Sequence, residues 1–448
     1  MRLDWLIIGG GIHGVHIAAR LLGEARVSAD ALRIIDPADR LLMRWRSCTR
    51  ITGMTHLRSP VVHHLDLNPR SLKRFASDYR STSTRTFAPP YDLPALGLFD
   101  AHCDQVVETF GLAERHIQER VVGMHIGCEG VSVRLSGGDE LTAGNIVLAI
   151  GASEQPRRPA WAPTESERVQ HVFEEGFDAW PCEARERVAV VGGGISAGQV
   201  ALRLKKEGHD VHLVSRHALR QHQFDSDPGW LGPKFMSSFG REPDLDRRRA
   251  MIVEARHQGS VPPDIERGLR TALAREEIRW HEGEVEGLAS KERALKLRLT
   301  TGESLEVQRV LLATGFRSER PGGAMLDELI ASASLPCADY GYPIVDASLR
   351  WHPRVHVCGP LAELELGPAS RNIAGARRAG DRLVSVARAQ RTTGRWQACV
   401  STRGIDRGGA GAHLNDATCL PKKVAAHIQT IQRSSSTSSH RNTLPVPL

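Results

Sequence analysis

The chain has 448 residues, of which 41% are hydrophobic, so it is long enough for two or three globular domains and unlike a fibrous or disordered protein. The net charge is +7, but residues 391–448 carry eight Lys or Arg and two Asp, which leaves the other 390 residues near neutrality. This distribution does not indicate a nucleic-acid partner. No stretch approaches the ~20 consecutive apolar residues of a membrane span.

The first glycine-rich turn follows a short apolar segment at residues 6–8. Gly9, Gly11 and Gly14 have the G-x-G-x-x-G spacing of a dinucleotide-binding turn. In that motif the first glycine permits a tight exit from a strand, the second lets the backbone approach a pyrophosphate, and the third lets a helix pack closely on the strand. We expect a helix at about 12–22 whose positive N-terminal end faces the phosphates. His13 lies inside this turn, either near phosphate or exposed to solvent.

An acidic residue stands where the motif requires one. A second apolar strand is predicted at 32–35, and Asp36 ends it. A carboxylate about 20 residues after the glycines typically hydrogen-bonds an adenosine ribose. The first unit therefore predicts a Rossmann-like domain that binds the adenosine of a dinucleotide.

A second turn of the same type follows residues 188–191. Gly192 and Gly194 keep the spacing, and Ala197 takes the third position, which the motif tolerates. We expect its helix at about 195–207. Two such turns predict an α/β, three-layer protein with two Rossmann-like domains that hold two dinucleotides, and FAD with a nicotinamide cofactor is the natural pair.

The strand after the second turn ends in Ser215 and Arg216 rather than in an acid. A 2′-phosphate prefers a hydroxyl and a guanidinium, whereas a free 2′-hydroxyl prefers a carboxylate. We therefore expect NADPH rather than NADH at this site. The alternative is that Arg216 is an ordinary solvated loop residue.

The order of the segments predicts an FAD-binding domain interrupted by an NADPH-binding domain. Residues 41–110 look irregular, and 121–150 look like a β-ribbon followed by a buried strand. The final residues have no sustained periodicity and predict a disordered or weakly helical tail. The expected boundaries are 1–155 for the first FAD part, 156–182 for a proline-containing linker, 183–305 for the NADPH domain, 306–390 for the second FAD part, and 391–448 for the basic tail.

Eight cysteines are spread along the chain, each at least 20 residues from the next, so no close redox or zinc pair is present. The histidines at 56, 63, 64, 209, 212, 217 and 222 form two groups, but neither matches a zinc-ligand pattern, so no metal is expected. Reduced thiols and a start without a signal-like segment favour a cytoplasmic location.

The two turns resemble those of flavoproteins with two dinucleotide-binding domains, and the chain looks most like single-component flavin monooxygenases of the lysine/ornithine N-hydroxylase type. The similar stretches are Trp45 with 54–60, 87–91 with Phe99, and 224–239. The strand-then-glycine segments 148–151 and 312–315 look like the crossovers between the two domains of such proteins. Thr55 and Arg58 depart from the glutamine and lysine of the N-hydroxylases, so the resemblance does not extend to an amino-acid substrate.

The resemblance implies that Trp45 contacts FAD. It also implies a helix starting near Ser370 whose N-terminus faces the pyrimidine end of the flavin, with Gly359 allowing close approach; the alternative is a surface helix. NADPH and O₂ would then act through a C4a-hydroperoxyflavin to hydroxylate a small nucleophilic substrate. Trp230 and Phe235 either line its pocket or belong to the core.

Two other function classes remain open at this point: an FAD-dependent NAD(P)H reductase or oxidase without oxygen insertion, and a non-catalytic nucleotide-binding redox sensor. The catalytic residues are not identifiable, and a homo-oligomer is possible. We expect no specific nucleic-acid or membrane partner.

Overall fold

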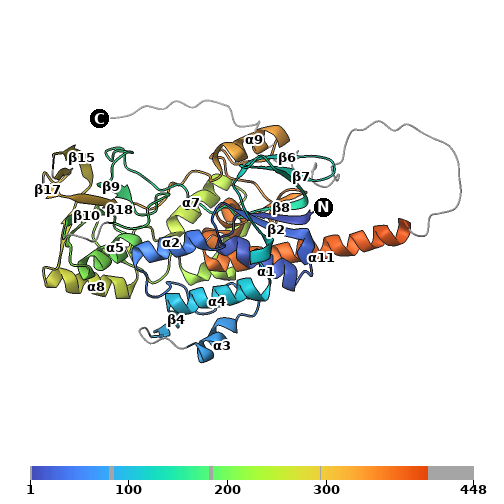
Figure 1. Cartoon of the computed structure of the whole chain (residues 1–448), viewed down its shortest axis with the longest axis horizontal. Helices are drawn as coiled ribbons and strands as arrows, with labels where there is room; N and C mark the ends of the chain where they lie inside the picture. The colour runs from blue at the N-terminus through green and yellow to red at the C-terminus, as the bar shows by residue number, and fades with distance from the viewer. Residues whose placement is uncertain (1–2, 80–84, 181–184, 293, 402–448) are drawn as a thin grey trace, which may run out of the picture. The chain divides into compact units, whose positions relative to one another are not determined.

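A computed structural model describes residues 3–79, 85–180, 185–292 and 294–401 (Figure 1). The fold considered below is that of the compact unit formed by residues 1–393.

The first domain is built around a mainly parallel sheet. Its parallel strands lie in the order β5 (His116–Gln118), β2 (Leu32–Asp36), β1 (Leu3–Ile8), β8 (Glu140–Leu148) and β20 (Val355–Val357). Leu6 and Ile7 point to opposite faces of β1, and both are fully buried. The strand is apolar on both faces because the sheet is covered on both sides.

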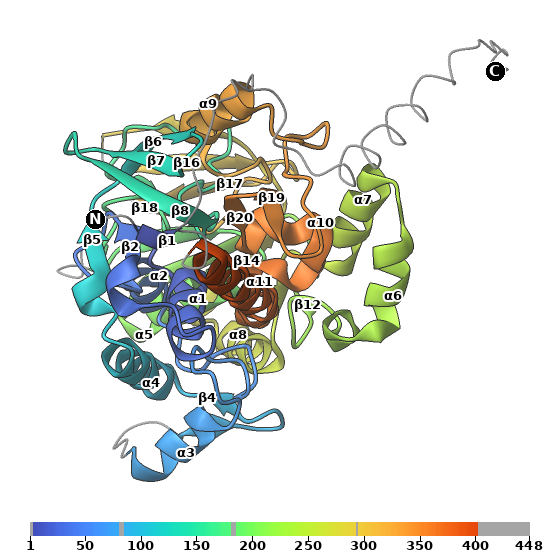
Figure 2. The ribbon, with the colours of Figure 1, turned by 90° about the vertical axis from the view of Figure 1, so that its right-hand side faces the viewer.

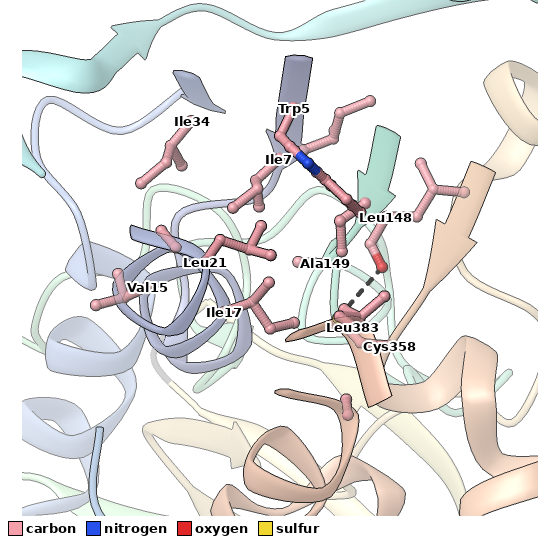
Figure 3. Close-up of a cluster of buried hydrophobic side chains, with 14 of the residues drawn as sticks. Trp5, Ile7, Val15, Ile17, Leu21, Ile34, Leu148, Ala149, Cys358 and Leu383 are labelled. Atoms are coloured by element: carbon pink, nitrogen blue, oxygen red, sulfur yellow. Dashed lines mark hydrogen bonds between the residues drawn. The ribbon is translucent and has the colours of Figure 1, made fainter. Parts of the chain in front are cut away.

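Two helices from opposite ends of this unit cover one face of the sheet. α1 (Ile12–Gly23) follows β1, and α11 (Ile373–Ser401) returns from the C-terminal side. Figure 3 shows Val15, Ile17 and Leu21 of α1 and Leu383 of α11 in the cluster beneath the strands. The other face carries the hairpin of β6 (Val121–Ile126) and β7 (Val131–Leu135) together with α9 (Gly323–Ala333) (Figure 2).

The second domain has a parallel sheet of its own. The strands lie in the order β14 (Ile278–Glu282), β11 (Asp210–Ser215), β10 (Arg187–Val191), β18 (Arg309–Leu312) and β9 (Val169–His171). Val188 and Val190 of β10 face the helices α5 (Ile195–Lys206) and α8 (Pro263–Ala274). Ala189 faces a layer formed by β15 (Val285–Ser290), β16 (Leu295–Leu299) and β17 (Ser304–Val307). The two parallel sheets confirm the expected fold class, an α/β protein with two Rossmann-like domains.

A helical insertion separates β11 from α8. It contains β12 (Arg220–Gln221), α6 (Pro233–Arg241), α7 (Leu245–Ala255) and β13 (Ser260–Val261). The Asp244 carboxylate accepts hydrogen bonds from two backbone N–H groups at the start of α7 and so caps that helix. The apolar side chains of this insertion pack against residues 338–364 of the first domain.

The structure corrects the expectation for residues 41–110. This segment contains α2 (Met43–Thr52), α3 (Ser71–Asp78), α4 (Leu96–Thr109) and the short strands β3 (Phe87–Ala88) and β4 (Leu93–Pro94). The sequence did not indicate α2 because the segment is polar. It contains several arginines, and its only buried residues are Thr49, Ile51 and Thr52.

The expected domain boundaries also shift. β9 lies inside the segment 156–182, which was expected to be a linker, yet it pairs with β18 at the edge of the second sheet. β18 itself lies beyond residue 305, where that domain was expected to end. Two antiparallel crossover segments join the domains: the Arg157 N–H donates to Gly315 O (2.9 Å), and the Arg317 N–H donates to Gln155 O (2.9 Å). The return to the first domain thus begins after Gly315.

Helix α2 contacts both domains. Arg203 of α5 donates from Nη1 to the carbonyls of Arg50 (2.8 Å) and Ile51 (2.9 Å) at the C-terminal end of α2. Arg44, near the other end, donates to the carbonyls of Ser153 (2.6 Å) and Phe173 (2.5 Å). Ile51 is buried within the core of the second domain.

α11 continues through residues 391–401, which agrees with the helical alternative for the start of the tail, whereas residues 402–448 lie outside the described residues. Arg391 donates from Nη1 to the carbonyls of Ala25 (2.5 Å) and Arg26 (2.8 Å), and Arg388 donates to that of Glu24 (2.9 Å). Within the described ranges, no helix is both long and apolar enough to cross a bilayer.

These contacts predict that the body of the protein extends past residue 390. Arg391→Ala is expected to lower the free energy of unfolding by about 1–2 kcal/mol, because it removes a charged donor from two carbonyls. A chain ending at Ser401 retains Arg391 and is expected to unfold at the same temperature as the full chain. Thermal unfolding followed by circular dichroism tests both statements. An unchanged midpoint in Arg391→Ala would contradict the first, and a lowered midpoint for the shortened chain would contradict the second.

Candidate functional site

The glycines of the first turn have three different surroundings. Gly9 has a φ of +109°, and a Cβ there would lie 2.5 Å from Ala149 O. A Cβ on Gly14 would lie 1.8 Å from Gly9 O, so the helix can meet the strand this closely only with glycine. A Cβ on Gly11 would meet no atom within 4 Å. Gly9 and Gly14 therefore serve the packing of the protein, whereas Gly11 borders open space at the N-terminus of α1.

Asp36 is held beside this turn. Its Oδ2 accepts a hydrogen bond from the Gly10 N–H (2.7 Å), and its Oδ1 accepts one from the Ala38 N–H (3.0 Å). Each oxygen keeps a further lone pair, because a carboxylate offers about four acceptor positions. The structure thus orients the carboxylate at the end of β2, next to the open face of the turn.

A group of buried polar atoms lies near the first turn. His13 faces Gly359: a Cβ on that glycine would lie 3.7 Å from His13 Nδ1. The ring nitrogens of His13 and the hydroxyl of the fully buried Ser370 make no hydrogen bond of good geometry in the described part of the chain, although the backbone of Arg371 and Asn372 lies close enough to the imidazole to partly oppose the lowering of its pKa. Burial lowers the pKa of His13 to about 4, so the imidazole is neutral at pH 7. Unsatisfied buried polar atoms are costly, and they mark a place where a polar ligand would fit.

The helix expected to start near Ser370 begins slightly later. Ser370 lies in a 3₁₀ turn, η5 (Pro368–Arg371), and α11 begins at Ile373. The turn and the helix are in close contact, because a Cβ on Gly375 would lie 2.3 Å from Ser370 O. Gly359 has a φ of +62° and begins the 3₁₀ turn after β20.

Trp45 lies on α2, whose N-cap residue Leu42 donates its N–H to Gly10 O (2.8 Å). The indole Nε1 donates to Asp100 Oδ1 (3.1 Å), and the ring packs on Phe99. Trp45 is therefore oriented by α4, and its expected contact with FAD stays a proposal.

The second turn resembles the first in its packing. Gly192 has a φ of +153°, and a Cβ there would lie 2.4 Å from Ala313 O. Ala197, which replaces the third glycine, is buried in α5 and tolerated there. The space beside Gly194 is less open than that beside Gly11, because a Cβ on Gly194 would lie 3.5 Å from Gly259 Cα. The segment 256–260 thus approaches the turn, which the sequence did not indicate because this segment has no regular pattern.

Ser215 and Arg216 have different placements. Ser215 is buried, and its hydroxyl donates to His217 O (2.9 Å) and accepts from Trp280 Nε1 (2.9 Å). Its O–H is therefore directed at a backbone carbonyl, and its expected contact with a 2′-phosphate stays a proposal. Arg216 is exposed and has no ion-pair partner among the described residues. His217, which the sequence did not single out for this site, packs against Gly193 and Gly259.

The aromatic candidates of the helical insertion pack in a hydrophobic cluster. Trp230 is buried with Phe239, Ile252 and Tyr342, and Phe235 packs on the edge of that cluster, which favours the core interpretation for both. The described residues contain no group of three metal-ligating side chains.

The fold and the two turns define a protein with two Rossmann-like dinucleotide-binding domains. Residues 3–390 match the family of pyridine nucleotide-disulphide oxidoreductases, and the chain belongs to this family. No curated protein matches the sequence.

Several solved structures share this fold, and they include N-hydroxylases of the lysine/ornithine type that the sequence resembles. The ornithine N-hydroxylase of Kutzneria sp. 744, in its structure with reduced FAD, NADP⁺ and L-ornithine, has a TM-score of 0.70 at 18% identity over 87% of this chain and 100% of its own. The L-lysine 6-monooxygenase of Pseudomonas syringae has a TM-score of 0.63 at 18% identity over 86% and 99%. The bacillithiol disulfide reductase of Bacillus cereus has a TM-score of 0.56 at 17% identity over 87% and 100%.

Gly11 and Gly14 differ in their surroundings, so substituting each of them gives a matched test of the first turn. Gly11→Val is expected to weaken FAD binding at least tenfold without unfolding the protein. Its backbone (φ −78°) suits any residue, and the new side chain takes the place of a pyrophosphate bound through charge-assisted contacts of ~1.5–3 kcal/mol. Gly14→Ala is expected instead to destabilise the fold by about 3 kcal/mol or more, because of the clash with Gly9 O.

FAD content per purified protein and the thermal unfolding midpoint separate these two effects. A Gly11→Val protein that retains full FAD would show that the turn does not hold the pyrophosphate.

Proposed function

We propose that the protein is an FAD- and NADPH-dependent monooxygenase that oxygenates a small nucleophilic substrate. The observation that carries the proposal is the pair of glycine turns, each at the centre of its own parallel sheet and each followed by a helix N-terminus. The first turn takes FAD and the second takes NADPH. FAD, when bound, accepts two electrons from NADPH and activates O₂.

The residues around the first turn suit the pyrophosphate and the ribose of FAD. The unfilled space at Gly11 and the N–H groups that begin α1 suit a pyrophosphate, and Asp36 is oriented to accept from a ribose hydroxyl. The unpartnered polar atoms of His13 and Ser370 provide further hydrogen bonds nearby. Because His13 is neutral, it orients a ligand without adding a charge.

A thiol-based reaction has less support than oxygen transfer. Cys358 directly precedes Gly359, but it is fully buried, and its Sγ donates to Leu148 O (3.4 Å). Burial raises the pKa of this thiol well above its usual value, which keeps it protonated and unreactive. The other described cysteines, Cys48, Cys103, Cys128 and Cys337, are also free thiols.

The substrate is not assigned as an amino acid. Arg58, near the position where the N-hydroxylases have a lysine, donates to the carbonyls of His222 (2.6 Å), Gln223 (2.7 Å) and Phe224 (2.9 Å). Its guanidinium therefore joins residues 53–60 to the helical insertion, and these bonds compete with recognition of a substrate carboxylate.

A second candidate is an NAD(P)H reductase or oxidase without oxygen insertion. The fold shared with the bacillithiol disulfide reductase supports this class as well. The products of O₂ consumption distinguish the two candidates.

The choice of nicotinamide cofactor gives a direct test of Arg216. Arg216→Ala is expected to weaken NADPH binding roughly 10- to 100-fold, which corresponds to the loss of a charge-assisted contact of ~1.5–3 kcal/mol. NADH binding should stay nearly unchanged, because NADH has no 2′-phosphate. Titrations of the FAD-loaded protein with both nucleotides measure this, and an equal loss for both would show that Arg216 does not contact the phosphate.

The reaction is tested by screening amines, ketones and sulfides for stimulated NADPH oxidation under ¹⁸O₂. A monooxygenase incorporates one ¹⁸O atom into the product, as detected by mass spectrometry, while hydrogen peroxide production falls when the correct substrate is present. NADPH oxidation that yields only hydrogen peroxide or a reduced acceptor under all conditions would favour the reductase or oxidase. Absence of NADPH turnover from FAD-loaded protein would favour a redox sensor.

A further inference from the structure

A buried carboxylate joins the helical insertion to the first domain. Glu363 begins the short helix α10 (Glu363–Leu366), which lies beside α7 (Figure 2), and its side chain is 1% exposed. It pairs with Arg249 of α7, and it accepts hydrogen bonds from Nε (3.1 Å) and Nη2 (2.9 Å) of Arg371 in η5. One carboxylate therefore binds a guanidinium of the insertion and a guanidinium of the turn that contains Ser370.

The side chain of Tyr342 contacts both of these arginines. Arg371 donates from Nη2 to the Tyr342 hydroxyl (2.9 Å), which in turn donates to Ser318 O (3.0 Å). The guanidinium of Arg249 lies over the same ring, 4.8 Å from its centroid, and donates from Nη2 to Ser318 O (3.1 Å). Because Tyr342 is 1% exposed, these groups are shielded from bulk solvent, and their charges interact more strongly than they would at the surface.

Glu363 is needed to balance the positive charges of this region. Burial lowers the pKa of Arg256, and the guanidiniums of Arg371 and Arg249 lower it further, so the three arginines lie close enough to repel one another. Asp225 pairs with Arg256 (3.1 Å) and opposes that shift. Without Glu363, three guanidiniums would share the Asp225 carboxylate, and a buried charge that has lost its partner is strongly destabilising.

The insertion contacts both ends of η5. Gly367, directly before this turn, has a φ of +73°, and a Cβ there would lie 3.0 Å from Met236 Sδ of α6. Arg371, at the other end, is joined to α7 through Glu363. Ser370 lies between these two points, and its buried hydroxyl has no hydrogen-bond partner in the described part of the chain. A movement of the insertion would therefore move the Ser370 hydroxyl.

We propose that Glu363 is a positioning residue that holds the insertion against η5 and so limits the access of water to a flavin bound beside this turn. The inference rests on the proposed FAD-dependent function, in which η5 faces the flavin. With the ion pair intact, the insertion and η5 move together. Without it, the insertion separates from η5 more often, and the water that enters favours hydrogen peroxide over oxygen transfer.

Hydrogen–deuterium exchange of the FAD-loaded protein, followed by mass spectrometry, measures this separation. In Glu363→Gln, the amides of 245–255 and 368–375 are expected to exchange at least about tenfold faster than in the wild type, because the buried pair is lost. The amides of β10, in the centre of the second sheet, should keep their exchange rates.

Iodide quenching of the flavin fluorescence measures the access of solutes to the cofactor. Glu363→Gln is expected to raise the quenching constant roughly threefold, and to raise the share of NADPH oxidation that ends in hydrogen peroxide. The double variant Arg249→Met/Glu363→Gln removes a positive charge together with the negative one, so it restores the charge balance but not the link. It should recover most of the thermal midpoint lost in Glu363→Gln while the faster quenching persists. If the pair served stability alone, both readouts would recover together.

Glu24→Gln is the matched control. It removes a carboxylate from another ion pair with a mostly buried arginine, Arg20 (2.8 Å), at the end of α1 remote from the glycine turn. Quenching and exchange in 245–255 and 368–375 should stay at their wild-type values.

An FAD-loaded wild type, with unchanged quenching and exchange in both Glu363→Gln and the double variant, would overturn the inference while leaving the proposed function in place. The double variant decides the outcome by itself if the single variant does not fold. A folded wild type that cannot bind FAD would instead contradict the proposed function, and this inference with it.

Discussion

The structure depends on the absence of a side chain at Gly14. With a carbonyl oxygen only 1.8 Å from the position of its missing Cβ, α1 lies as close to β1 as the backbone allows. This approach places the helix N-terminus at the carboxyl edge of the sheet, beside the end of β2 and Asp36. In the second domain Ala197 takes the position of the third glycine, and Gly192 lies against Ala313 O as Gly9 lies against Ala149 O.

Much of the fold could be predicted from the sequence because its signals are local. The strands at the two turns are apolar on both faces, α1 and α5 start where the glycines place them, and the ribbon before β8 alternates in the usual way. Local signals did not predict the elements whose formation depends on tertiary contacts. α2 forms although its composition is polar, and β9 is a three-residue strand that exists only because β18 offers it an edge.

The candidate site was predictable in its backbone and much less so in its side chains. The positions of Gly11 and Asp36 follow from spacing, because the motif fixes where they lie. Ser215 follows the expected strand, but its O–H donates to His217 O, and its oxygen accepts from the indole of Trp280, which comes from a strand 65 residues later. The neutrality of His13 and the approach of Gly259 to Gly194 depend on segments remote in the chain, and a single sequence carries no signal for either.

The arginine bonds at the two ends of α2 constrain how the domains can move. Arg203 holds its C-terminal end from the second domain, and Arg44 holds its other end to the crossover and to Phe173. A hinge rotation between the domains would have to break several charge-assisted bonds together and withdraw Ile51 from the second core. These contacts therefore oppose a hinge rotation that would change the separation between the two dinucleotide turns. We expect the approach of a nicotinamide ring to a flavin to depend mainly on the cofactor and on the short loops around it.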